Sequence, residues 1–129
     1  QRFTDETWYT HHDERVVAVI AAVPFAADFD LASLAQPRAA LGLVIAGGDI
    51  NQVPRFHVQA VRAACKTCTV VAEFPQAGHG VMLSPLPPFA PGTISAELNG
   101  DPPGFERAPA IAELERAVLR FFSRHVLAP

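Results

Sequence analysis

Two residues next to glycines could carry acid–base chemistry. Asp49 follows two glycines in "GGD", and His79 lies between two glycines in "FPQAGHGVM", directly after the apolar run "TVVAEF". Small residues let the backbone come close to a neighbour, and an imidazole placed there can act as a general base. A carboxylate within reach would fix one ring tautomer and stabilise the imidazolium. Taken alone, Asp49 fits a turn or helix-cap residue and His79 a structural side chain. Together they predict an orienting acid and a base.

The elements that must position this pair alternate along the chain. Three apolar runs with β-branched residues predict strands over 15–23, 38–46 and 69–74. Helical spacing predicts a short helical stretch within 24–37 and helices over 50–66 and 107–126. Alternation of this kind is typical of a right-handed parallel α/β sheet. Because ligands bind at the carboxyl ends of such strands, Asp49 and His79 should lie at the same end of neighbouring strands.

A proline-rich segment separates the third predicted strand from the last predicted helix. Residues 84–104 hold six of the chain's 12 prolines. A loop of this length next to His79 predicts a lid or a pocket wall, although a stiffened surface excursion is the alternative. Residues 1–14 are expected to form a surface segment that leads into the first strand, and all 129 residues are expected to belong to one domain.

Composition excludes two classes of partner. The chain has 10 basic and 13 acidic residues, a formal net charge of −3, and no Lys/Arg cluster longer than a pair, so no nucleic acid partner is expected. The longest apolar run is interrupted by Pro24 and is too short to predict a membrane span. Half of the residues are apolar, which is enough to build a core.

The cysteines form one CxxC motif, Cys65 and Cys68. Redox catalysis is disfavoured because the motif ends a helical pattern, where the helix dipole does not stabilise a thiolate. Zinc is disfavoured because no second pair completes a site. Two alternatives stay open: a local disulfide in a secreted or periplasmic enzyme, or two half-buried free thiols. A cytoplasmic location therefore also stays open.

Several other side chains have both a functional and a structural interpretation. Apolar residues beyond the strand ends could form an acyl or alcohol pocket or belong to the core: Phe25, Phe29, Val81 and Met82. A group near the N-terminus could bind a metal or wall a substrate, but adjacent histidines point apart, so a solvated loop without metal is favoured: Trp8, Tyr9, His11, His12 and Asp13. His57 and His125 are expected on the surface, and Glu106 and Arg107 are expected to cap the last helix.

Four stretches carry a resemblance to a known family. They are "DERVVAVIAAVPF", "GLVIAGGDINQVP", "FPQAGHGVML" and "GFERAPAIAELERAVLRFFSRHV". In this order they resemble the C-terminal half of a dienelactone hydrolase-like α/β-hydrolase, the group that also includes platelet-activating-factor acetylhydrolase-like enzymes and cutinase-like polyester esterases. The resemblance extends from Asp13 over nearly the whole remaining chain. It implies that Asp49 is the acid and His79 the base of a Ser-His-Asp triad, with no metal or organic cofactor.

The sequence departs from that family over a large part of the expected fold. None of the serines lies in a Gly-x-Ser-x-Gly elbow, and the early strands and the oxyanion-hole loop have no counterpart. We therefore expect the C-terminal half of an α/β-hydrolase fold, completed by a partner polypeptide that carries the first strands and the nucleophile. The expected activity is hydrolysis of neutral carboxylic esters. A non-catalytic α/β ligand-binding module is the alternative, and a Cys in place of the Ser nucleophile is a further open point.

Overall fold

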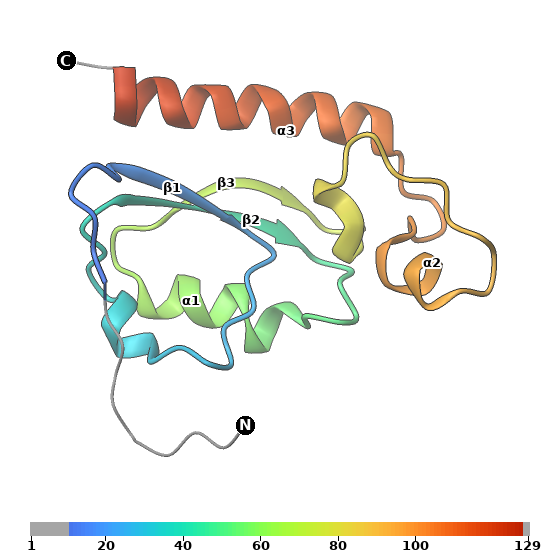
Figure 1. Cartoon of the computed structure of the whole chain (residues 1–129), viewed down its shortest axis with the longest axis horizontal. Helices are drawn as coiled ribbons and strands as arrows, with labels where there is room; N and C mark the ends of the chain where they lie inside the picture. Colours follow the sequence, from blue (N-terminus) through green and yellow to red (C-terminus); the bar gives the residue numbers. More distant parts are fainter. Residues whose placement is uncertain (1–10, 128–129) are drawn as a thin grey trace.

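Three parallel strands form the centre of the molecule. The computed structural model describes residues 11–127, and its sheet has the order β1-β2-β3, with β1 at Ala18–Ala22, β2 at Ala40–Ala46 and β3 at Thr69–Phe74 (Figure 1). Both neighbouring pairs are parallel. The predicted α/β class, with three parallel strands and intervening helices, is therefore confirmed.

The last predicted helix, over 107–126, is present, whereas the one predicted over 50–66 is shorter in the structure. They are α1 (Val58–Ala64), α2 (Ile94–Asn99) and α3 (Arg107–Phe122), and a π-helical turn at Ser123–Leu127 follows α3. The prediction of one helix over 50–66 is wrong. Pro54 starts a separate 3-10 turn, and His57 has non-helical dihedral angles of φ −122° and ψ −96°, so α1 begins only after it.

The core lies on both faces of β2. Leu43, Val44 and Ile45 are at most 1% exposed. Because side chains alternate along a strand, Val44 packs in the cluster below α3, and Leu43 and Ile45 pack in the cluster with α1. Figure 1 shows α3 on one face of the sheet and α1 on the other. β2 is thus a fully covered central strand, as its uninterrupted apolar sequence predicts.

A glycine in β2 brings α3 close to the sheet. A Cβ atom at Gly42 would lie 2.5 Å from Val71 and 3.0 Å from the ring of Phe121. Phe121 can therefore pack over the strand only because position 42 has no side chain. This contact fixes the height of the last turns of α3 above β2 and β3.

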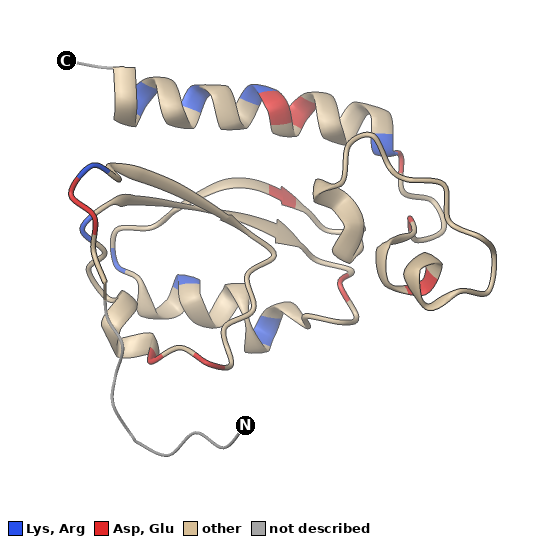
Figure 2. Cartoon of the chain, viewed as in Figure 1, with Lys and Arg blue, Asp and Glu red and all other residues tan. Residues whose placement is uncertain are grey.

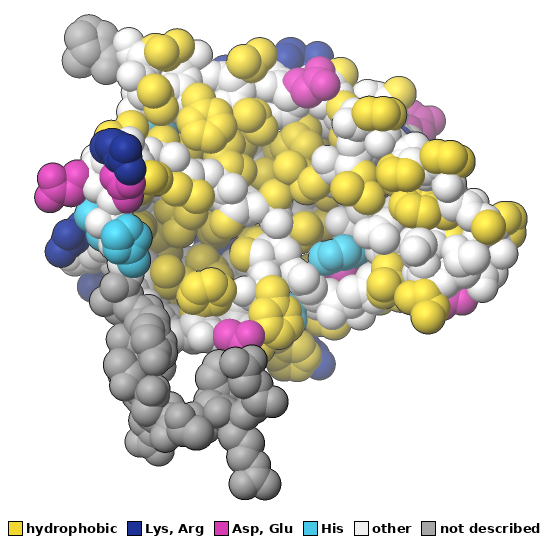
Figure 3. Space-filling model, in the orientation of Figure 1, with side chains coloured by type: hydrophobic (Ala, Val, Ile, Leu, Met, Phe, Trp, Pro, Cys, Tyr) yellow, Lys and Arg dark blue, Asp and Glu magenta, His cyan; other side chains and the backbone are white. Residues whose placement is uncertain are grey.

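β1 forms an open edge of the described sheet, and this edge is apolar. No charged residue lies in β1 or β2 (Figure 2). The side chains of Val16, Val17 and Val19 are 44%, 51% and 38% exposed, and Figure 3 shows hydrophobic side chains gathered on this side of the molecule. The uninterrupted apolar run at 15–23 predicts a strand that is buried on both faces, and this prediction is wrong for β1 within the described residues. No further strand within residues 11–127 pairs with the outer side of β1.

Cys65 and Cys68 form a disulfide, with Cα atoms 5.5 Å apart. The bond joins the end of α1 to the segment before β3. It lies at the amino end of β3, away from the turns that follow β2 and β3. None of the helices within residues 11–127 has the length and apolar character that crossing a membrane requires.

Candidate active site

The turns that follow β2 and β3 bring Asp49 and His79 together. An Oδ2 atom of Asp49 and Nδ1 of His79 are 2.8 Å apart. The ends of the two strands are level, with Ala46 paired to Phe74, so the next residues of each strand enter the same space. Backbone bonds continue the pairing into the turns, from Gly47 N–H to the Phe74 carbonyl at 2.9 Å and from Gly48 N–H to the Ala77 carbonyl at 3.0 Å. The sheet therefore sets the distance between the acid and the imidazole.

The acid turn explains why the two residues before Asp49 are small. A Cβ atom at Gly47 would lie 2.6 Å from the carbonyl oxygen of Pro75, and one at Gly48 would lie 3.1 Å from that of Ala77. The backbone after β2 consequently passes directly against the backbone after β3. This close approach is what the sequence "GGD" predicts at the end of a buried strand.

The carboxylate of Asp49 is fully buried, and both of its oxygens have hydrogen-bond partners. Its Oδ1 accepts hydrogen bonds from the backbone N–H groups of Asn51 and Gln52 at 2.8 and 2.9 Å, and its Oδ2 faces the ring of His79. Its side chain is 0% exposed, whereas that of His79 is 26% exposed. At this distance a carboxylate oxygen can accept Nδ1–H of the ring, which is the tautomer that leaves the lone pair on Nε2. The other ring nitrogen, Nε2, is left free to take up a proton.

The histidine turn is tightly enclosed. His79 begins a 3-10 turn that runs to Met82. A Cβ atom at Gly80 would overlap the backbone carbonyl of Asn99, and one at Gly78 would lie 3.1 Å from the ring of Pro102. The glycines beside His79 are therefore required by the end of α2 and the residues after it.

Arg107 binds the histidine turn from the start of α3. Its guanidinium donates to the carbonyl oxygens of Gly80 and Leu83, at 3.1 and 2.7 Å, and forms a two-point ion pair with Asp101 at 2.8 and 2.6 Å. The sequence predicts only a capping role for Glu106 and Arg107. Glu106 does occupy the N-cap position of α3 but makes no side-chain cap bond. The additional role of Arg107 has no signal in the sequence, because its partners are backbone carbonyls remote along the chain.

The proline-rich segment 84–104 contains α2, which the sequence analysis missed. The signal is Thr93, whose hydroxyl accepts the N–H of Ala96 as an N-cap. The segment also contacts the acid turn, because the side-chain amide of Asn51 donates to the carbonyl of Leu98 at 3.2 Å. Residues 84–104 therefore pack against both turns that carry the acid and the base.

The predicted pocket residues divide into two groups. Phe25 and Phe29, beyond the carboxyl end of β1, are 47% and 58% exposed. Val81 is only 1% exposed and lies in the core cluster below α3, so in this structure it is a core residue and no pocket wall. Met82 is half-buried and packs against the same cluster.

The histidines outside the site have structural contacts. His57, expected on the surface, is half-buried: its Nδ1 accepts the N–H of Ala26 at 3.1 Å, and its ring lies 5.0 Å from that of Phe25. His125, also expected on the surface, is half-buried, with its ring 4.6 Å from that of Phe121. Neither lies beside a carboxylate in the described ion pairs.

The segment near the N-terminus shows no metal site in its described part. Trp8 and Tyr9 lie outside the described residues. Asp13 pairs with Arg15, and the side-chain and backbone hydrogen bonds from Arg15 hold the pKa of Asp13 below its ordinary value. Among residues 11–127 no group of three or more His, Cys, Asp or Glu side chains is placed to hold a metal ion.

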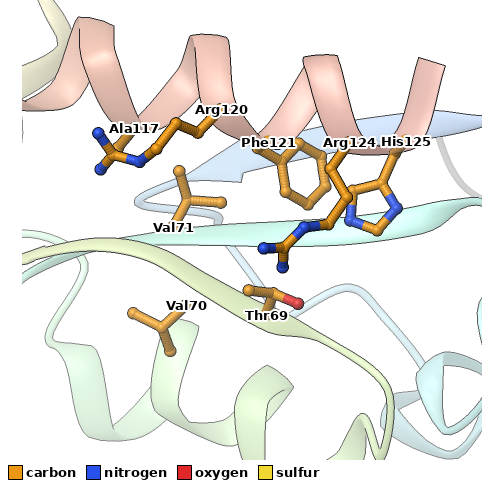
Figure 4. Close-up of a pocket in the computed structure, with 8 residues that line it drawn as sticks. All are labelled: Thr69, Val70, Val71, Ala117, Arg120, Phe121, Arg124 and His125. Carbon is orange, nitrogen blue, oxygen red and sulfur yellow. The ribbon is translucent and has the colours of Figure 1, made fainter. Parts of the chain in front are cut away.

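A separate pocket of about 160 Å³ lies between α3 and the start of β3 (Figure 4). Val71, Ala117 and Phe121 form its apolar part, and Thr69, Arg120 and Arg124 bring polar groups to it. Basic side chains at the C-terminal end of a helix complement the helix dipole, which accounts for the arginines. Since β3 runs away from this pocket toward His79, the pocket belongs to the opposite end of the sheet.

The arrangement of Asp49 and His79 can move a proton but includes no nucleophile. Within residues 11–127, no Ser, Thr or Cys side chain is hydrogen-bonded to His79. The chain matches no protein-family model, no curated protein and no solved structure. Chemical interpretation therefore depends on the geometry of the site itself.

Proposed function

We propose that this chain is a subunit or part of a serine ester hydrolase, and that it supplies the acid and the base of a Ser-His-Asp triad. The observation that carries the proposal is the hydrogen bond between buried Asp49 and half-buried His79 at the carboxyl ends of adjacent parallel strands. An oriented imidazole with one free nitrogen is the part of a triad that activates a hydroxyl. Its place at the strand ends agrees with the general location of ligand sites in such sheets.

The proposed reaction has two steps. Nε2 of His79 takes the proton of a serine hydroxyl as the oxygen bonds to the ester carbonyl carbon, and then gives that proton to the departing alkoxide. In the second step His79 takes a proton from water, hydroxide attacks the acyl carbon, and the proton returns to the serine oxygen. Asp49 stays ionised and stabilises the imidazolium in both steps. The serine and the N–H groups that hold the oxyanion belong to a polypeptide segment outside these 129 residues.

The open edge of β1 supports such a completing segment. The outer side of β1 offers unpaired backbone groups flanked by exposed Val17 and Val19. A long apolar edge of this kind is unfavourable in water and is satisfied by a further strand. A partner polypeptide that adds strands beside β1 would bring its own strand ends to the same edge as Asp49 and His79.

The substrate class is proposed from the surroundings of the site. Phe25, Phe29 and Met82 are the apolar candidates for a wall, and the Arg107 guanidinium, which contacts the histidine turn, is already paired with Asp101. Such surroundings favour neutral carboxylic esters over strongly anionic ones. The chemistry needs neither metal nor organic cofactor.

The disulfide supports a secreted or periplasmic location. Disulfides form and persist in oxidising compartments and are rare in the cytosol. The test is alkylation of the native protein in cell extracts before any reduction. Unmodified Cys65 and Cys68 would support the proposed location, and two alkylated thiols would contradict it.

The function is tested by labelling with a fluorophosphonate, which reacts with activated serines. The native assembly is labelled and its chains are weighed by intact mass spectrometry, for the wild type, His79→Ala and the matched control His125→Ala. We expect a serine outside these 129 residues to take the label in the wild type and the control, and labelling to be lost in His79→Ala. Equal labelling in His79→Ala would contradict the proposal. Absence of any labelled partner in the wild type would favour a non-catalytic ligand-binding module instead.

A further inference from the structure

A closed series of contacts connects Asp49 and His79 through the other side of the site. From the acid turn, Asn51 donates to the carbonyl of Leu98. The chain then passes through Asn99, whose carbonyl lies directly against Gly80, to Asp101, which pairs with Arg107. The Arg107 guanidinium returns to the histidine turn at the carbonyls of Gly80 and Leu83.

Arg107 is the one side chain in this series that binds both ends of the histidine turn. Gly80 directly follows His79, and Leu83 is the residue at which the 3-10 turn ends. The planar guanidinium offers five N–H groups in a fixed geometry, so it can hold two carbonyls and both carboxylate oxygens of Asp101 at once. The Arg107 and Asp101 side chains are 17% and 28% exposed, so the ion pair is largely removed from solvent.

We propose that Arg107 is a positioning residue, which with Asp101 holds the histidine turn at the place where Nδ1 of His79 meets Asp49. Without it, the carbonyls of Gly80 and Leu83 lose a charged donor, and the turn is held only by its own backbone bonds and by packing. The ring can then leave the carboxylate, and the preference for the tautomer with Nδ1–H is lost. The consequence for catalysis rests on the proposed function, whereas the effect on the ring of His79 does not.

The test follows the ring nitrogens of His79 by ¹⁵N NMR in histidine-labelled protein. The variants are Arg107→Met, Arg107→Lys and Asp101→Asn, with Arg116→Met as a control on an exposed position of α3. In the wild type at a pH where the ring is neutral, we expect Nδ1 to carry the proton. In Arg107→Met we expect the two nitrogen shifts to move toward each other as the tautomers mix. Lysine keeps the charge but cannot make all four bonds, so the His79 nitrogen shifts of Arg107→Lys should lie between those of the wild type and Arg107→Met. The shifts of Arg116→Met should match those of the wild type.

A second measurement gives the catalytic consequence in the complete enzyme. A displacement of the base by about 1 Å should lower kcat about 100-fold in Arg107→Met. KM should change little, because no substrate contact is removed. An unchanged kcat in a folded Arg107→Met enzyme with displaced ring shifts would count against the proposed function and leave the positioning role intact.

The proposal has its own failing outcome. If the amide spectrum of Arg107→Met shows a folded chain and the His79 ring shifts equal those of the wild type, Arg107 does not position the imidazole. If Arg107→Met does not fold, the His79 ring shifts of Arg107→Lys and Asp101→Asn test the proposal in its place. Ring shifts unchanged in both variants would overturn the proposal, and shifts intermediate between the two tautomers would support it.

Discussion

Asp49 and His79 are 30 positions apart in the chain, and the carboxylate oxygen of one lies 2.8 Å from Nδ1 of the other. The remaining carboxylate oxygen accepts hydrogen bonds from two backbone N–H groups, so both oxygens have partners. The acid is therefore unable to rotate without breaking three hydrogen bonds. A base whose orienting partner is held so firmly has one preferred ring orientation.

Replacing Asp49 by asparagine should reverse the tautomer of His79. The side-chain oxygen of the new asparagine must accept the hydrogen bonds from the N–H groups of Asn51 and Gln52, because an NH₂ group cannot accept them. The NH₂ group of the asparagine then faces Nδ1 of His79 and donates a hydrogen bond to it. Nε2 consequently keeps its proton and cannot act as a base. We expect kcat of the proposed hydrolase to fall about 10⁴-fold in Asp49→Asn.

The control for that variant is Asp30→Asn. Asp30 also accepts a backbone N–H, from Ala32, but in an exposed turn. Its substitution should leave kcat unchanged. Comparable losses in both variants would mean that Asp49→Asn acts through general stability, which urea unfolding of the two proteins measures.

Adding a methyl group at Gly80 should separate α2 from the histidine turn. The new Cβ atom would overlap the carbonyl of Asn99, which is backbone and cannot swing away. We expect Gly80→Ala to lose about 1–3 kcal/mol of unfolding free energy, as overpacked sites do, and to disturb the ring shifts of His79. Thermal or urea unfolding and ¹⁵N spectra measure the two effects.

Gly92→Ala is the control for the effect of replacing a glycine by alanine where no clash occurs. Gly92 has φ +74° and no atom within 4 Å of a built Cβ, so alanine there meets conformational strain of about 1 kcal/mol but no clash. Its ring shifts should equal those of the wild type. A Gly80→Ala protein as stable as Gly92→Ala, with unshifted His79, would show that α2 does not press on the turn.

Removing the disulfide should lower stability but leave the active site intact. Cross-linking two residues with a sequence separation of 3 closes a small loop, for which chain entropy predicts a loss of about 2 kcal/mol on reduction. The bond lies at the amino end of β3, and His79 follows the carboxyl end. The Cys65→Ser/Cys68→Ser variant should therefore unfold earlier yet show wild-type ring shifts for His79 below its transition. Altered ring shifts in the folded variant would contradict this separation.

A charge at the edge of β1 should prevent association with the proposed partner polypeptide. Val19 is 38% exposed on an edge strand without charges, and an unpaired lysine buried at an interface costs several kcal/mol. We expect Val19→Lys to weaken association at least about 100-fold, as measured by native mass spectrometry of the purified assembly. Leu119→Lys, at a 68% exposed position of α3, should associate normally. Equal association of the two variants would exclude β1 as the docking edge.

The central part of the fold could be predicted because its signals are local. β2 is an uninterrupted apolar strand closed by two glycines, and the rule that strand ends collect functional residues is enough to bring Asp49 to His79. Period-2 alternation and burial then place Leu43 and Val44 on opposite faces. These inferences need no knowledge of distant contacts.

The parts that could not be predicted depend on contacts remote in sequence. Arg107 meets Gly80 and Leu83 across 27 and 24 positions, and carbonyl partners leave no pattern of residue types. α2 is only six residues long between prolines and a glycine, so its N-cap, Thr93, was its one signal. The prediction of one helix over 50–66 is wrong because it treats the apolar residues on both sides of Pro54 as one helical pattern, whereas a separate 3-10 turn begins at Pro54.

The edge strand at Ala18–Ala22, which has no neighbour on its outer side in the described sheet, also affects how the chain behaves by itself in solution. A strand of alanine, valine and isoleucine with free backbone donors and acceptors pairs with any similar strand, including the same strand of another copy. Self-pairing of β1 would compete with docking of the proposed partner polypeptide, and it would increase with the concentration of the chain. If the proposal is correct, the yield of native protein should therefore rise when the chain folds together with that partner, because the apolar edge of β1 is then covered.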